Sequence, residues 1–276
     1  MSGPRPSIIA HRGSSHSAPE HTLQAYRQAI AEGADALECD VRLTRDGHLV
    51  CVHDRRIDRT SNGTGTVSEF DLATLGQLDF AAWKDERSIH AGEDQLVEGV
   101  EGRAASGQPA PVLTLETLLQ EVLAAPRRVR LLIETKHPTR YAGQVEKQLV
   151  RLLRRYGLAD PRTEQTSVVT VMSFSELALR RVRQRAPRLP TVLLIQRPAP
   201  WRASGRLPRG VAIAGPGVRL LRGRPDFVRR VQAHGHPVYA WTVNNQNDLD
   251  LALSFDVAGV ITDRPADVLE GIGHLG

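Results

Sequence analysis

Short runs of apolar residues recur along the chain and alternate with segments that carry apolar residues at helical spacing. The runs consist mostly of Val, Ile, Leu and Ala, which is typical of parallel strands buried on both faces. We predict eight strands, at residues 7–11, 36–41, 130–135, 167–173, 191–196, 211–215, 237–242 and 259–263.

Helices are predicted between these strands. In residues 22–32, Leu23, Tyr26 and Ile30 recur at a spacing that places them on one helical face, and Thr22 is a favourable N-cap. Similar patterns predict helices at 114–123, 144–156, 174–185, 225–233, 247–254 and 264–269. Alternating strands and helices predict an α/β protein built on a parallel sheet.

A hairpin is predicted after the second strand, because Asp-Gly at 46–47 lies between two β-forming runs. With a turn of two residues, Arg45 faces His48 and Asp40 lies opposite His53. This register places Glu38, Asp40 and His53 on one face of the hairpin.

The same register predicts that the two cysteines, Cys39 and Cys51, point to opposite faces of the hairpin. A disulfide between them is therefore not expected, which is typical of a reducing compartment.

Polar and ionisable residues follow several of the predicted strands, at their carboxyl ends. A closed barrel brings all of these ends to one mouth, whereas a doubly wound open sheet, the alternative, spreads them along a crevice. We therefore predict a TIM (β/α)8 barrel that forms one domain over residues 1–276. The residues concerned are His11, Glu38, Asp40, Glu134, Lys136, Ser173, residues 241–244 and Asp263.

Residues 84–111 interrupt the alternation, because they are polar and rich in glycine. We predict a long loop beside the mouth of the barrel. Such a loop could cover a substrate or form passive surface, and the sequence does not decide between the two.

Composition supports a globular protein with a sizeable core. The chain has 276 residues, of which 41% are hydrophobic and 24% charged. No apolar run approaches the ~20 residues that span a bilayer, so no integral membrane segment is predicted. The chain enters its first strand within a few residues of Met1, so we expect no secretory signal and a cytoplasmic location.

The net charge of +5 is concentrated in residues 180–230, which hold fourteen arginines and one acidic residue, Asp226. Such a segment could attract phosphates, nucleic acid or an anionic membrane, but solvated helix faces are the favoured interpretation. Aromatic residues are sparse there, so no nucleic-acid partner is predicted.

Three carboxylates form a candidate metal site. Glu38 and Asp40 share a face of one strand, and Glu134 ends a neighbouring one. Oxygen ligands favour a divalent cation such as Mg²⁺ or Ca²⁺ over zinc. A buried salt-bridge cluster with arginine or lysine is the alternative, but three inward-facing acids without a cation would be costly.

His11 and His53 lie beside these carboxylates and form a candidate acid–base pair. Arg12 and Lys136 could neutralise a phosphodiester anion. The combination predicts metal-assisted phosphodiester hydrolysis.

Four further residues have supporting roles in this hypothesis. Trp241 could stack on an apolar or glycerol-like group or pack at the barrel top. Glu20 and Asn244 are predicted to hold the ligating and catalytic groups in orientation. Gly13 is predicted to let the backbone approach the ligand closely.

These residues lie in segments that resemble the glycerophosphodiester phosphodiesterase family over nearly the whole chain. The resemblance implies a TIM barrel, a divalent cation on Glu38, Asp40 and Glu134, and general acid–base catalysis by His11 and His53. It also implies the hydrolysis of a glycerophosphodiester to glycerol 3-phosphate and an alcohol. The matching segments are AHRG (10–13), PEHT (19–22), GAD (33–35), ECDV (38–41), TRDG (44–47), VHD (52–54), IETK (133–136), SF (173–174), AWTVN (240–244) and ITDRP (261–265).

One departure concerns position 21, where the commoner family pattern has Asn and this chain has His21, a form that resembles a known variant. Residues 84–111 match the family poorly. The alternatives are a lysophospholipase D or phospholipase C-like reaction on the same scaffold, or a non-catalytic protein that binds a phosphate ligand.

Overall fold

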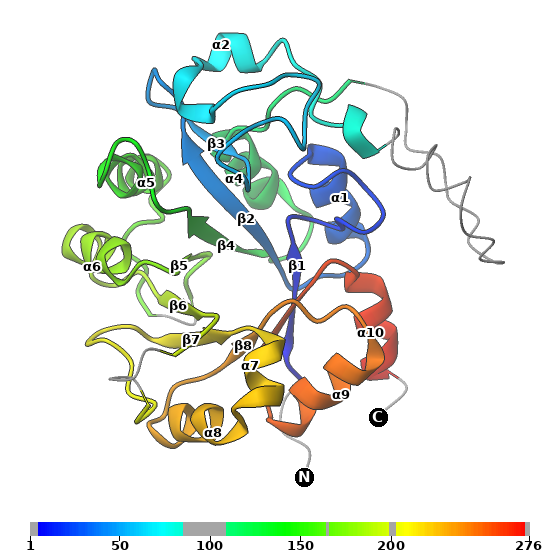
Figure 1. Ribbon diagram of the computed structural model, residues 1–276, viewed down its shortest axis with the longest axis vertical. Helices are drawn as coiled ribbons and strands as arrows, with labels where there is room; N and C mark the ends of the chain where they lie inside the picture. The colour runs from blue at the N-terminus through cyan, green and yellow to red at the C-terminus, as the bar shows by residue number, and fades with distance from the viewer. Residues whose placement is uncertain (1–4, 85–108, 164–165, 199–202, 274–276) are drawn as a thin grey trace, which may run out of the picture.

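The protein is a barrel of eight parallel strands with its helices outside, in a computed structural model that describes residues 5–84, 109–163, 166–198 and 203–273 (Figure 1). A short strand, β3, pairs antiparallel with β2. The strands are β1 (Ser7–His11), β2 (Ala36–Leu43), β3 (Leu49–Cys51), β4 (Arg130–Thr135), β5 (Val169–Ser173), β6 (Thr191–Ile195), β7 (Ile213–Pro216), β8 (Tyr239–Ala240) and β9 (Gly259–Thr262).

The barrel closes between β7 and β8, the two ends of the hydrogen-bonded order of strands. The hydrogen-bonded order of the sheet is β7-β6-β5-β4-β2-β1-β9-β8. Parallel bridges then join Ala214 to Val238 and Gly217 to Trp241, so that β7 also meets β8. The predicted TIM (β/α)8 barrel is therefore confirmed against the open sheet.

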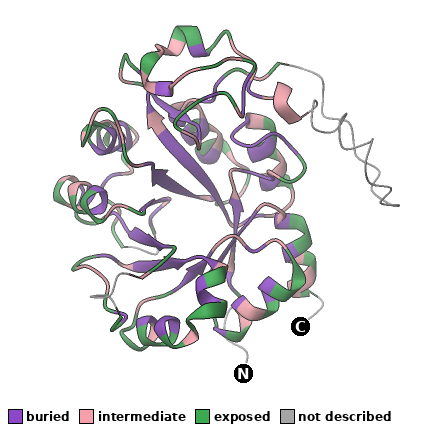
Figure 2. Ribbon diagram, viewed as in Figure 1, coloured by how far each residue is buried: buried purple, intermediate pink, exposed green. Residues whose placement is uncertain are grey.

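The helices surround the strands, and the strands and the helix sides that face them are buried (Figures 1 and 2). Helix α1 begins as predicted, because Thr22 Oγ1 accepts the N–H of Ala25 at 3.2 Å. The helices are α1 (Leu23–Ala31), α2 (Leu72–Leu75), α4 (Leu115–Ala124), α5 (Gln144–Arg155), α6 (Glu176–Arg185), α7 (Val218–Gly223), α8 (Pro225–Ala233), α9 (Gln246–Ser254) and α10 (Pro265–Gly273), with a 3₁₀ turn at Val67–Glu69.

Two differences from the predicted elements have local causes. Helices α2 and α7 were not predicted, because four and six residues are too few to display a helical period. Strand β8 is reduced to Tyr239–Ala240. Pro237, where the strand was predicted to begin, has no N–H to donate to a neighbouring strand.

The hairpin register differs from the prediction by one residue. Arg42 lies opposite Val50, and the N–H of Val52 donates to the carbonyl oxygen of Asp40 at 3.1 Å. Val52, and not His53, is therefore the partner of Asp40.

The slip comes from a turn of three residues, 45–47, in place of two. Thr44 closes this turn, because its Oγ1 accepts the N–H of His48 at 2.9 Å and its carbonyl oxygen accepts that of Gly47 at 3.1 Å. Gly47 has a φ of +88°, the left-handed conformation that three-residue hairpin turns require at their last position.

The prediction that the cysteines face opposite sides is consequently wrong. Cys51 pairs with Val41, which shares a face with Cys39. Both thiols are free and buried. Burial, with a hydrogen bond between Cys39 and Cys51, raises the pKa of the Cys39 thiol well above its ordinary value. The positions of the two cysteines therefore give no information about the redox compartment.

Gly13 allows close packing of the turn after β1 against α1, and its predicted role in the approach of a ligand stays a prediction. It follows β1 with a φ of +85°, and a Cβ atom there would lie 2.6 Å from the backbone carbonyl carbon of Ala25 in α1. Glycine thus lets the turn after β1 rest directly on the first turn of the helix.

Gly13→Ala is expected to destabilise the protein more than Gly47→Ala. Both glycines have a left-handed φ, which costs a side chain roughly 1–2 kcal/mol, but nothing lies within 4 Å of a Cβ at Gly47. The clash at Gly13 adds about 1–3 kcal/mol. Urea unfolding of the two variants measures the difference, and equal losses would contradict this account of the turn.

The predicted loop at 84–111 falls largely on residues 85–108, which lie outside the described residues. Lys84 at its start is anchored, because its Nζ donates to the carbonyl oxygens of Ser15, His16 and Ala18 at 2.8–2.9 Å. Among the described residues, no helix is both long and apolar enough to cross a membrane.

Candidate active site

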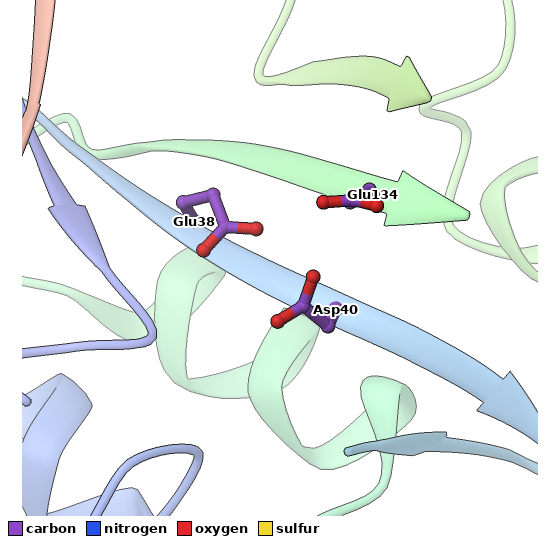
Figure 3. A group of neighbouring side chains, drawn as sticks. All are labelled: Glu38, Asp40 and Glu134. Carbon is purple, nitrogen blue, oxygen red and sulfur yellow. The ribbon is translucent and has the colours of Figure 1, made fainter. Parts of the chain in front are cut away.

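Three buried carboxylates meet inside the mouth of the barrel. Glu38 and Asp40 project from β2, and Glu134 projects toward them from the adjacent strand β4 (Figure 3). Each offers a ligand atom within 4.8 Å of the others. Strand register brings them together, since Asp40 is the direct neighbour of Glu134 and Glu38 lies two residues earlier on the same face.

Two cationic side chains border this cluster. Lys136 Nζ lies 2.9 Å from Glu134 Oε1 and 3.2 Å from Asp40 Oδ1. Arg12 Nε lies 3.1 Å from Asp40 Oδ2, and the Arg12 backbone N–H donates to Glu38 Oε2 at 3.1 Å. When all three carboxylates are ionised, their charge exceeds that of the two cationic side chains by one.

The electrostatics of the cluster correspond to a cation site. Burial, and then repulsion by the neighbouring carboxylates, raises the pKa of Glu38 well above its usual range and that of Glu134 to about 8. Burial opposes ionisation of Asp40 too, but a hydrogen bond from His21 and the charges of Lys136 and Arg12 hold its pKa well below normal. Acids that resist ionisation here become ionised when a cation binds.

The residues present fit a hard divalent cation. All three candidate ligands are carboxylates, and the searched part of the chain contains no other group of three or more such side chains around one point. Once these carboxylates are ionised, Arg12 and Lys136 leave one negative charge that a cation can balance.

His11 and His53 are each held by a carboxylate on the same ring nitrogen. His11 Nδ1 lies 2.6 Å from Asp263 Oδ1, and His53 Nδ1 lies 2.7 Å from Asp54 Oδ1. A hydrogen bond at Nδ1 fixes the tautomer and leaves Nε2 available for proton transfer.

The two histidines differ in electrostatic environment. Burial is the main reason that the pKa of His53 is lowered to about 4, and Arg12 and Lys136 add to this effect. Beside His11, hydrogen bonds from His11, Asn244 and Ser15 hold the pKa of Asp263 far below normal despite its burial.

Asn244 supports His11 through Asp263. Its Nδ2 donates to Asp263 Oδ2, and its Oδ1 accepts the Asp263 N–H at 2.9 Å. Glu20 has a similar position beneath the Arg12 turn. It accepts from Arg12 at 3.1 Å and from Arg59 at 2.7 and 2.9 Å, which lowers its pKa to about 2 despite burial.

A cavity of about 330 Å³ opens beside the carboxylates. One wall is polar and the other is apolar. Trp241 belongs to the apolar wall, where its Nε1 donates to the carbonyl oxygen of Gly215 at 2.6 Å and its ring packs edge-on against Phe174. The lining residues are His11, Arg12, Glu38, His53, Glu134, Lys136, Met172, Phe174, Leu194, Gln196, Trp241, Thr242 and Ile261.

A second, more open cavity of about 550 Å³ shares His11 and Arg12 with the first. It lies on the side of Trp83, Lys84 and Arg264. The two cavities therefore meet at the residues that border the carboxylate cluster.

Sequence reasoning missed several residues of this site. Asp54 adjoins His53 in the sequence, and this adjacency was an available signal. Arg59 pairs with both Asp54 and Glu20, and no local pattern marks it. His21 attracted notice only as a departure from a motif, yet its Nε2 lies 3.0 Å from Asp40 Oδ2.

The sequence is similar to those of known proteins over most of its length. The sequence profile of the glycerophosphoryl diester phosphodiesterase family matches residues 11–267. The chain is 45% identical over 260 residues to a probable glycerophosphodiester phosphodiesterase 1 of Mycobacterium tuberculosis, covering 94% of this chain and 90% of the relative. It is 34% identical to the glycerophosphodiester phosphodiesterase of Bacillus subtilis, covering 93% and 83%.

The fold agrees as well. An Oleispira antarctica phosphodiesterase, solved with the product sn-glycerol-3-phosphate, superposes with a TM-score of 0.76 at 25% identity and covers 97% of each chain. The family match extends over nearly the whole chain and includes all five candidate metal-binding and acid–base residues. The chain therefore belongs to the glycerophosphoryl diester phosphodiesterase family of enzymes.

Proposed function

We propose that this chain hydrolyses glycerophosphodiesters to glycerol 3-phosphate and an alcohol, with the help of a divalent cation. The observation that carries the proposal is the meeting of three buried carboxylates with two histidines, each held by a carboxylate on Nδ1. Family membership and the product bound by the Oleispira antarctica relative support the substrate class.

The cation, Mg²⁺ or Ca²⁺, is held by Glu38, Asp40 and Glu134 in this proposal. When bound, it supplies Lewis acidity at a phosphoryl oxygen. With all three carboxylates ionised, the bound cation, Arg12 and Lys136 together would give the cluster one net positive charge, which attracts a phosphodiester monoanion. Arg12 and Lys136 bind phosphoryl oxygens that gain charge during the reaction.

His53 is the general base in this scheme, because the low pKa keeps its imidazole neutral near pH 7. It accepts the proton of the attacking group, which is either water or the glycerol 2-hydroxyl. Attack by the 2-hydroxyl gives a cyclic phosphate, which water then opens to glycerol 3-phosphate. His11 is the general acid in this scheme: Asp263 holds its Nδ1, and its Nε2 donates a proton to the oxygen of the departing alcohol.

Cavity shape suggests where the two halves of the substrate lie. The cavity of about 330 Å³ has an apolar wall at Trp241 and Phe174 and suits the small glycerol half. The more open cavity on the far side of His11 suits an alcohol of variable size.

A substrate panel tests this function. Glycerophosphocholine, glycerophosphoethanolamine and glycerophosphoglycerol are expected to release glycerol 3-phosphate, measured by a coupled dehydrogenase assay. Lysophosphatidylcholine, the lipid arm of the panel, is expected to react more slowly. Release of phosphocholine in place of choline would show cleavage on the other side of the phosphate from the one proposed. If none of the four substrates reacts, the proposal is refuted.

A further inference from the structure

His21 lies directly behind the candidate metal ligands. It follows Glu20 in the turn between β1 and α1, it is 6% exposed, and it has a left-handed φ of +61°. Its backbone N–H donates to the carbonyl oxygen of Arg12 at 3.1 Å. The turn that carries Arg12 therefore also fixes the position of the His21 ring.

The ring bridges a carboxylate and a phenol. Nε2 lies 3.0 Å from Asp40 Oδ2, and Nδ1 lies 2.8 Å from the hydroxyl of Tyr26. An ionised carboxylate only accepts hydrogen bonds, so Nε2 must carry a proton. This conclusion holds for the neutral imidazole and for the imidazolium.

Tyr26 can supply the complementary hydrogen bond. Its single proton has two possible acceptors, His21 Nδ1 at 2.8 Å and the carbonyl oxygen of Glu38 at 3.1 Å. That carbonyl already accepts the backbone N–H of Arg12 at 3.1 Å. Donation from Tyr26 to Nδ1 therefore leaves every group satisfied when the imidazole is neutral, and it fixes the Nε2–H tautomer.

Tyr26 is itself rigid. It lies on α1, is fully buried, and belongs to the apolar layer between helices and strands. A hydroxyl at the end of such a side chain fixes the position of the His21 ring. The chain of contacts thus runs from the packed core through Tyr26 and His21 to Asp40.

We infer that His21, supported by Tyr26, is a positioning residue that fixes the Asp40 carboxylate before a cation binds. The inference rests on the proposed metal site. Asp40 Oδ2 accepts the N–H at His21 Nε2 and lies near Arg12. The other oxygen, Oδ1, lies on the side of Lys136 and Glu134. Fixing Oδ2 turns Oδ1 toward the centre of the cluster.

Loss of this support is expected to weaken cation binding. Residues that orient metal ligands typically contribute roughly 10–100-fold to metal affinity. The alternative is that His21 and Tyr26 only fill the core. A purely structural role lowers the unfolding temperature without changing the affinity for the cation, and this difference separates the two.

The test titrates MgCl₂ and CaCl₂ into chelator-treated full-length protein by calorimetry. Tyr26→Phe removes one oxygen and is expected to raise the metal Kd about 10-fold, while His21→Ala raises it about 100-fold. His21→Gln keeps an N–H donor that can reach Asp40 and is expected to recover most of the affinity.

Tyr156→Phe is the matched control. Its hydroxyl hydrogen-bonds to Glu116 and Gln120 far from the cluster, so its removal should alter stability but leave the metal Kd unchanged. Metal Kd values within twofold of the wild type for both Tyr26→Phe and His21→Ala overturn the inference alone. A wild-type protein that binds neither cation overturns the proposed metal site together with it.

Discussion

Replacement of His11 or His53 by alanine is expected to lower kcat/KM for a glycerophosphodiester by about 10²–10⁴-fold, the usual contribution of a general acid or base. His11 ends β1 and His53 lies two residues beyond β3, yet each is held at Nδ1 by its own carboxylate. The loss should therefore appear in the chemical step, with little effect on folding.

The control is His48→Ala, which removes an exposed histidine of the hairpin turn and should leave the rate unchanged.

The pKa of His53 offers a second measurement. A base with a pKa of about 4 is neutral and active above that pH and is lost only as the pH falls through 4. NMR titration of the imidazole should therefore show a histidine signal that titrates near pH 4 and disappears in the His53→Ala protein. Near-wild-type rates in both histidine variants would end the acid–base assignment.

Glu134→Gln is expected to lower activity by roughly 10³-fold, because a catalytic cation contributes several kcal/mol of transition-state stabilisation. The stability of the folded protein should not decrease. Without a cation, Glu134 has its pKa raised to about 8, mainly by burial and then by Asp40. A raised folded pKa means that stability falls as the pH rises from the unfolded value toward 8, and glutamine avoids this loss.

Thermal unfolding separates loss of the ligand from loss of the fold. At pH 8 the chelated Glu134→Gln protein should be at least as stable as the chelated wild type, but it should gain little stability when MgCl₂ or CaCl₂ is added. Glu121→Gln, which removes a surface carboxylate paired with Arg27, should respond to the cations like the wild type. An equal gain in all three proteins would show that Glu134 is not a ligand.

The sequence predicted the barrel because its strands are buried on both faces and therefore appear as apolar runs. Residues at the ends of those runs, such as His11 and Glu134, then had to lie at one mouth. The observed strands β1 and β4 have the predicted bounds.

The predictions from sequence were wrong where hydrogen bonds of side chains determine the backbone conformation. Two-residue and three-residue turns both fit the segment around Gly47, and the hydrogen bonds of Thr44 select the longer one. A shift of one residue reverses the face of every side chain on the hairpin partner. His53 still reaches the site, because β3 ends at Cys51 and the chain is free to turn.

The sequence also did not predict which residues from distant segments contact each other. Asp263 holds His11 from a position 252 residues later in the chain, and periodicity contains no information about such a pair. Tyr26 was assigned to an apolar helical face, which is correct for its ring. The role of its hydroxyl beside His21 becomes visible only in three dimensions.

The most direct test of the central claim is removal of the cation from the wild-type enzyme. After exhaustive treatment with EDTA and removal of the chelator, release of glycerol 3-phosphate from glycerophosphocholine should fall to the background rate. Addition of MgCl₂ or CaCl₂ should restore it in the wild type but not in Glu134→Gln. Full turnover by the chelated enzyme would contradict a cation held by Glu38, Asp40 and Glu134.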